Sequence, residues 1–218
     1  MSTSLRLMLA AMAAVLLLAF GLGTASARNL SITIEKFKAT WRSLEFVSEF
    51  VTIRCPVTLE GSFSSRTIAK VLGLLIGPVN RAVVKQEACT NGRVAAFNGS
   101  ETYNGSTTSN TLPWHISFEV FFGRLPAIES VSILFSRFRF GVTAPGLCTG
   151  QYGTAENRIL FSLPLNAGGE VTGITPVAGS NTVNLLRTDS GICPTTGRLA
   201  GSGSIAEPGG ITIKIRLI

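Results

Sequence analysis

Apolar and polar residues alternate with a period of two along most of this chain, and clusters of turn-forming residues interrupt the alternation. In the last segment, Ile211, Ile213, Ile215 and Leu217 share one face, and a threonine and two basic residues share the other. This pattern is typical of a half-buried β-strand. Turn clusters recur about eleven residues apart, at 167–169, 178–181 and 189–191. The spacing predicts an all-β fold, either an antiparallel β-sandwich or a flattened barrel.

The other strands and turns are expected from the same alternation. Six more segments are expected to form strands, namely 30–38, 46–54, 57–64, 114–122, 131–142 and 159–163. Pro56 should lie at an edge or a bend, because proline cannot donate a hydrogen bond to a neighbouring strand. The segment 207–210, Glu-Pro-Gly-Gly, predicts a type II turn with glycine at the third position. The polar segment 100–110 predicts an exposed loop.

One segment departs from the alternation. Between residues 67 and 82 the apolar residues recur at helical spacing, and Ser65 is available as a cap. We therefore expect one short helix around residues 67–82, packed over the sheets, with Pro78 stopping or kinking it. The alternative is an amphipathic segment that touches a membrane. That alternative depends on the flanking basic residues Arg66, Lys70, Arg81 and Lys85.

The first 27 residues have the three parts of a secretory signal peptide. Arg6 supplies the positive charge, residues 7–20 form an apolar run, and Ala-Ser-Ala at 25–27 provides a cleavage site. We expect removal of residues 1–27, which leaves residues 28–218 as a single disulfide-stabilised β domain outside the cytoplasm. The apolar run is shorter than the roughly 20 residues that span a bilayer. Because the final strand reaches the last residue, we also expect no transmembrane anchor.

The charge of the mature chain is moderately positive. The whole chain has 19 basic and 12 acidic residues, and Arg6 is the only charged residue in the leader, so residues 28–218 carry a net charge of +6. No run of like charges occurs, and this argues against a nucleic-acid partner. Attraction to anionic cell-envelope polymers is expected instead, shared among exposed residues such as Lys214 and Arg216.

Four cysteines, at positions 55, 89, 148 and 193, lie in the mature chain. An exported protein with an even number of cysteines is expected to form disulfides. Three pairings are possible, and we favour Cys55 with Cys89 and Cys148 with Cys193, because short-range pairs demand least from an unknown topology. With one histidine and no C-x-x-C motif, the chain predicts no metal site and no cofactor.

Candidate catalytic residues are few. His115 is the only histidine, and no G-x-S-x-G motif marks a nucleophilic serine for it. Glu119 lies in an apolar strand, where partial burial would suit a general acid, although an ion pair with Arg124 or Arg137 is the simpler interpretation. His115, Glu119 and Arg137 therefore form our candidate functional cleft. The alternating Arg and Phe residues of 134–140 are expected to place phenylalanine in the core and arginine in solvent.

Four stretches resemble a group of exported proteins encoded in actinobacterial genomes. They are Cys-Pro-Val-Thr-Leu-Glu-Gly-Ser-Phe at 55–63, Thr-Ile-Ala-Lys-Val at 67–71, Leu-Pro-Trp-His at 112–115, and the closing segment 213–218. The resemblance covers most of the mature chain. It implies export and a β-rich fold, and it brings no activity with it.

Two functions are consistent with these features. The first is an exported, non-catalytic structural or binding module associated with the cell envelope. The second is a carrier that holds a small apolar ligand in an interior cavity, since 45% of the residues are hydrophobic and 13 are phenylalanine. Core packing accounts for those residues without a ligand, so the carrier ranks second and an enzyme third.

Overall fold

Antiparallel strands make up nearly all of the computed structural model, which describes residues 29–97, 102–103, 106–107, 111–124, 127–153 and 158–218. The elements in chain order are β1 (Asn29–Ile32), β2 (Lys36–Val47), β3 (Thr52–Ser62), β4 (Thr67–Ala69), β5 (Leu75–Val84), the 3-10 turn η1 (Gln86–Ala88), β6 (Arg93–Ala95), β7 (Thr102–Tyr103), β8 (Ser106–Thr107), β9 (Trp114–Phe122), β10 (Ser130–Ser136), β11 (Phe140–Ala144), β12 (Cys148–Tyr152), β13 (Arg158–Pro164), β14 (Thr175–Pro176), β15 (Thr182–Gly191), β16 (Thr196–Ala200), β17 (Ser204–Ala206) and β18 (Ile215–Leu217).

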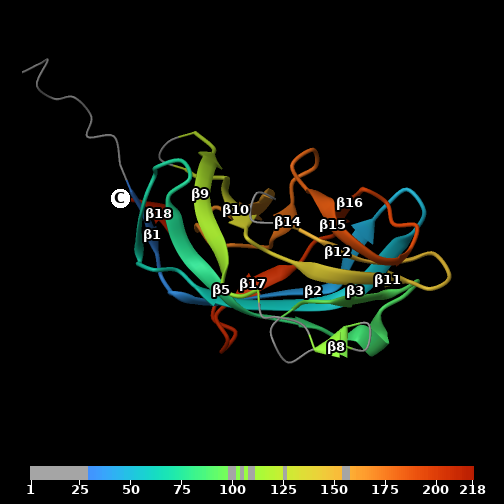
Figure 1. Cartoon of the computed structure of the whole chain (residues 1–218). Helices are drawn as coiled ribbons and strands as arrows, with labels where there is room; N and C mark the ends of the chain where they lie inside the picture. The colour runs from blue at the N-terminus through green and yellow to red at the C-terminus, as the bar shows by residue number, and fades with distance from the viewer. Residues whose placement is uncertain (1–28, 98–101, 104–105, 108–110, 125–126, 154–157) are drawn as a thin grey trace, which may run out of the picture.

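The strands form one large sheet and two small ones. The large sheet runs in the order β14-β13-β10-β9-β5-β3-β2-β16-β15-β12-β11-β6, and β17 also pairs with β2. The small sheets are β18-β1-β4 and β7-β8. Figure 1 shows how the large sheet curls, with β2 and β3 along one side, β9 and β10 above one end, and β11 and β12 above the other. The prediction of an all-β antiparallel fold is confirmed. Its antiparallel strands form one curled half-barrel sheet that packs against another.

The hydrophobic core lies inside this curl. In β2, the side chains of Phe37, Ala39 and Trp41 are buried while the residues between them are exposed or half-buried, and β3 repeats the alternation. Aromatic rings fill the space between the two sides of the curl. The rings of Phe46 and Tyr152 have centroids 4.8 Å apart, a separation at which edge contacts are favourable.

The expected helix at 67–82 is wrong, because this segment forms β4, a connecting loop and β5. The buried side chains of β5 are Ile76, Val79 and Ala82, three residues apart. Two register irregularities produce this spacing, one on each side of β5 in its pairing with β9 and β3. Each bulge inserts an extra residue, so the strand imitates helical periodicity. Ser65 still caps a turn, since its hydroxyl accepts a hydrogen bond from the Thr67 amide at 3.0 Å.

Pro56 lies inside β3 and opposite a bulge of β2, whereas we expected it at an edge or at a bend between two strands. In the pairing of β2 with β3, Trp41 is opposite Val57 and Leu44 is opposite Cys55. Two residues of β2 therefore face Pro56 alone, which defines a bulge. On its other side, β5 ends at the residue paired with Val57. Proline is tolerated here because few strand hydrogen bonds are available to it.

Several expected boundaries are wrong. The segment 131–142 is divided into β10 and β11, because Arg137 adopts a left-handed conformation with φ of 59°. The segment 46–54 crosses the turn between β2 and β3, and 189–191 lies inside β15. The turn at 207–210 closes with a hydrogen bond of 2.8 Å between its end residues, but Gly210 is the glycine with positive φ, which excludes the expected type II geometry.

Two predictions fall wholly or partly outside the described residues. The signal peptide at 1–27 is not covered, and of the segment 100–110 only the short paired strands β7 and β8 are. Within the described part of the chain, no helix has the length and apolar character needed to cross a membrane.

Candidate functional site

Both disulfides form the pairs that we favoured. Cys55 of β3 is bonded to Cys89, which follows η1, and Cys148 of β12 is bonded to Cys193, in the connection between β15 and β16. All four cysteines are used. Disulfides form and persist in oxidising compartments, and the two bonds therefore point to an extracytoplasmic environment.

The three residues of the candidate cleft lie in two places. His115 is half-buried on β9, and its cross-strand partner in β10 is Ser136. Arg137 directly follows Ser136 and is exposed, so His115 and Arg137 occupy neighbouring positions. Glu119 is the extra residue of a bulge further along β9. Four residues along a strand span roughly 13 Å, so His115 and Glu119 are not placed to act on the same bond.

Metal-binding chemistry has no visible basis in the described residues, which contain no cluster of three or more His, Cys, Asp or Glu side chains. The cavity described below is not lined by His115, Glu119 or Arg137. The candidate cleft formed by these three residues therefore stays a prediction.

Basic residues gather on the outer surface of β2, β3 and β5. Alternate residues of these neighbouring strands point away from the core, and the charged ones occupy that outer side. We call this surface the basic face. It consists of six cations and two carboxylates, namely Lys36, Lys38, Arg42, Arg54, Arg81 and Lys85, with Glu45 and Glu60, and Lys85 directly follows the last residue of β5. Six minus two gives a net charge of +4, whereas the remaining residues of 28–218 contribute only +2 of the total of +6.

Part of the basic face is internally paired. Glu60 of β3 lies between Lys38 and Arg81 in register, with N to O distances of 3.7 and 3.1 Å. Arg54 Nε lies 2.7 Å from Glu45 Oε1. Exposed pairs of this kind contribute about 0 to 1 kcal/mol each, so the stability of the fold does not explain the accumulation of charge.

Three cations of the basic face remain available for a partner. Lys36, Arg42 and Lys85 are exposed, and no carboxylate among the described residues forms an ion pair with them. The sequence did not predict this surface because its basic residues do not form a run of like charges. Its members come from three segments, 36–47, 52–62 and 75–85, which only strand pairing brings together.

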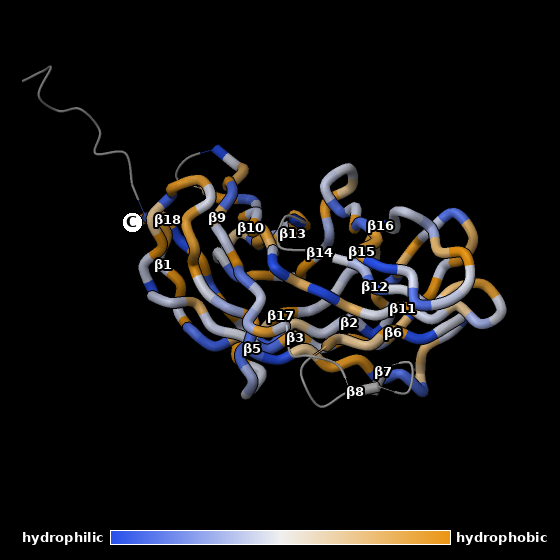
Figure 2. Tube along the Cα trace, viewed as in Figure 1, coloured by the Kyte–Doolittle hydropathy of each residue, from blue (hydrophilic) through white to orange (hydrophobic). Residues whose placement is uncertain are grey.

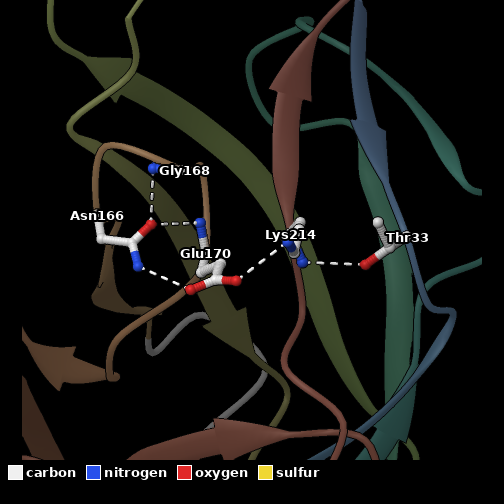
Figure 3. Close-up of polar contacts among 5 residues, drawn as sticks. All are labelled: Thr33, Asn166, Gly168, Glu170 and Lys214. Atoms are coloured by element: carbon white, nitrogen blue, oxygen red, sulfur yellow. Dashed lines mark hydrogen bonds and ion pairs between the residues drawn. The ribbon is translucent and has the colours of Figure 1, made fainter.

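Lys214, which we expected to be available to a partner, instead connects two other segments of the chain through Glu170 and Thr33. Its ammonium group lies 3.0 Å from Glu170 Oε1, and its backbone amide donates to Thr33 Oγ1 at 2.9 Å. The Asn166 amide donates to the other Glu170 oxygen at 2.8 Å. Figure 3 shows the complete network, in which the Asn166 carbonyl oxygen also accepts two backbone amides of the turn, those of Gly168 and Glu170. The hydrogen bonds from Asn166 and Lys214, together with the Lys214 charge, lower the pKa of Glu170.

An apolar cavity of about 70 Å³ lies inside the curl of the large sheet. Side chains from both sides line it, among them Trp41, Phe46, Trp114, Phe135, Phe140 and Phe161. Trp41 is fully buried, and its Nε1–H group has no hydrogen-bond partner among the described residues. An engineered cavity of about 150 Å³ admits benzene, so this one has room for only a few non-hydrogen atoms.

Comparison with known proteins adds no family to this description. The chain matches no protein-family model, no curated protein and no solved structure. The resemblance to exported actinobacterial proteins therefore stays a prediction, and function has to be argued from the geometry above.

Proposed function

We propose that this protein is an exported, non-catalytic binding module of the cell envelope, and that its basic face attaches it to anionic envelope polymers. The observation that carries the proposal is the concentration of charge, since one surface of three strands holds a net +4. Three cations without carboxylate partners, Lys36, Arg42 and Lys85, provide the direct contacts to phosphate or carboxylate groups of the polymer.

The shape of the basic face suits an extended polymer. Paired strands present side chains on a gently curved sheet surface, and neutral residues such as Thr40 and Thr58, which are opposite each other on β2 and β3, separate the charges. Contacts of this kind are numerous and individually weak. Their strength depends on screening, because the Debye length falls from about 10 Å at 0.1 M salt to about 3 Å at 1 M.

The proposal is tested by sedimentation with peptidoglycan that carries anionic polymers. We expect the protein to sediment with this material at 0.1 M salt and to be released near 1 M. Failure to sediment at low salt, or equal sedimentation at both salt concentrations, contradicts the proposal.

The apolar cavity favours a second candidate, a carrier of a small apolar ligand. Trp41, whose Nε1–H has no hydrogen-bond partner among the described residues, is one of the side chains that line this cavity. The volume of about 70 Å³ restricts the ligand to a molecule smaller than benzene unless the walls move. Native mass spectrometry of the purified protein would support the carrier if it finds a bound small molecule that is lost when Ala96, on the cavity wall, is replaced by leucine. An enzyme ranks third.

A further inference from the structure

Half of the large hydrophobic side chains that the described structure exposes are gathered at one end of the molecule. They come from the loop between β4 and β5, from the first residue of β5 and from the end of β9. We call this group the apolar end patch, and it consists of Val71, Leu72, Leu74, Leu75, Val120 and Phe122. Figure 2 shows the β4–β5 loop as a hydrophobic segment beside β9. Leu72 is 71% exposed and Phe122 is 54% exposed.

The two parts of the patch are held together by backbone hydrogen bonds. The Gly73 amide donates to the Phe118 carbonyl at 2.8 Å, and the Phe118 amide donates to the Leu74 carbonyl at 2.9 Å. The bulge at Glu119 then changes the direction of the following residues of β9, as bulges do. Phe121 faces Lys70, whose ammonium group lies 5.0 Å from the ring centroid, while Phe122 is exposed. The exposure of these apolar side chains is therefore fixed by backbone hydrogen bonds and by the bulge in β9.

We infer that the apolar end patch inserts into a lipid surface. The inference goes beyond the basic face, although it depends on the proposed envelope location, which brings the protein close to lipid. The patch could be covered by a second copy of the chain, by a polymer or by a lipid layer, and its shape and its charge favour the lipid layer.

The shape of the patch separates a second copy from a lipid layer better than its area does. Six side chains that are between one-third and three-quarters exposed present roughly 500 Å² of apolar surface. A stable interface between two copies buries about 800 Å² from each, of which rather more than half is apolar, so the area of the patch alone would allow either partner. The patch also protrudes, since a side chain added at Gly73 would meet no atom within 4 Å. A convex apolar tip suits a deformable lipid layer, in which no complementary pocket is required.

The charges around the patch agree with this partner. Lys70 and Arg124 adjoin its residues along the chain. Two acids lie close to it as well, namely the half-buried Glu119 beside Val120 and the exposed Glu129, whose amide donates to the Phe122 carbonyl at 2.8 Å. With charges of both signs at the border, the apolar residues provide the binding. Attachment should therefore persist at high salt and on vesicles without net charge, in contrast to attachment through the basic face.

The test is flotation of the chain from residue 28, which contains every described strand and both disulfides, with vesicles of phosphatidylcholine alone and vesicles that also contain phosphatidylglycerol. We expect the protein to float with both vesicles at 0.1 and 1 M salt, and the double variant Leu72→Ser/Phe122→Ser to bind about tenfold or more weakly. The matched control, Phe50→Ser/Ile192→Ser, removes an equally exposed pair outside the patch and should bind like the parent protein.

Two outcomes overturn the inference, namely no flotation of the parent protein, or equal loss in both double variants. Circular dichroism confirms that each variant is folded. Binding to peptidoglycan polymers is measured in parallel on the same samples. Salt-sensitive polymer binding without flotation would reject the lipid inference and leave the proposed function intact, whereas flotation without polymer binding would do the opposite.

Discussion

Removal of either disulfide should cost this protein several kcal/mol of stability, and by nearly equal amounts. The bond between Cys55 and Cys89 closes a loop with a sequence separation of 34, and the bond between Cys148 and Cys193 closes one with a separation of 45. The chain-entropy relation gives about 4 kcal/mol for each loop, with a difference of only a few tenths between them. The loops do not overlap in sequence, so the two losses should add.

The magnitude decides what each variant will do. A protein of this size has a free energy of unfolding of about 5 to 15 kcal/mol. Replacement of one pair by alanines therefore leaves a weakened but folded protein, whereas replacement of both pairs removes about 8 kcal/mol and brings a protein of average stability close to unfolding. Alanine is the suitable replacement because Cys55 and Cys148 are buried, and a serine hydroxyl would add an unpaired polar group there.

Urea denaturation followed by tryptophan fluorescence measures the loss for each variant by linear extrapolation. We expect the Cys55→Ala/Cys89→Ala and Cys148→Ala/Cys193→Ala variants to lose about 4 kcal/mol each. A loss below about 1 kcal/mol for either pair would show that its loop is already constrained in the unfolded state, and would refute the loop-entropy argument.

Two further predictions concern pH and buried hydrogen bonds. The neighbours of Glu170 lower its pKa in the folded protein, so the ionised carboxylate stabilises the fold above the pKa that it has in the unfolded chain. This contribution is lost as pH falls through the lower pKa of the folded state. The urea midpoint of Glu170→Gln should therefore decline less than that of the parent protein below about pH 4. Burial raises the pKa of Tyr152 to about 12, and its hydroxyl donates to the Pro194 carbonyl at 2.8 Å. Tyr152→Phe should lose about 1 to 2 kcal/mol at neutral pH, and an absorbance titration of the parent minus this variant should place the Tyr152 transition near pH 12.

Local alternation was sufficient to predict the all-β class and several elements. The segment 114–122 forms β9 with the expected bounds, because inward and outward residues alternate there until the bulge at Glu119. The cysteine pairing was also predictable, since short-range bonds close the least costly loops. At the end of the chain the alternation holds for Ile213 and Ile215, which are buried, but Ile211 is 60% exposed because the strand begins only at Ile215.

Bulges and long-range pairing were the features that the sequence did not reveal. In β5, two bulges space the buried residues three apart, and the segment 67–82 consequently resembled a helix. Both candidate surfaces arise from strands that are distant in sequence. Lys36 and Lys85 share one face only because β3 pairs with β2 on one side and β5 on the other, and the loop that carries Leu72 lies beside β9 only because β5 pairs with β9.

The measurement that tests the central proposal most directly compares two charge-neutralised variants in peptidoglycan binding at 0.1 M salt. The first, Lys36→Gln/Arg42→Gln/Lys85→Gln, removes the three cations of the basic face that lack carboxylate partners. The control, Arg137→Gln/Arg158→Gln/Arg216→Gln, removes the same charge from exposed positions on other parts of the fold. We predict that the first variant loses about tenfold or more in affinity, at roughly 0.5 kcal/mol or more per contact, while the control loses much less. Equal losses would show that only net charge matters, and would contradict a binding site on the basic face.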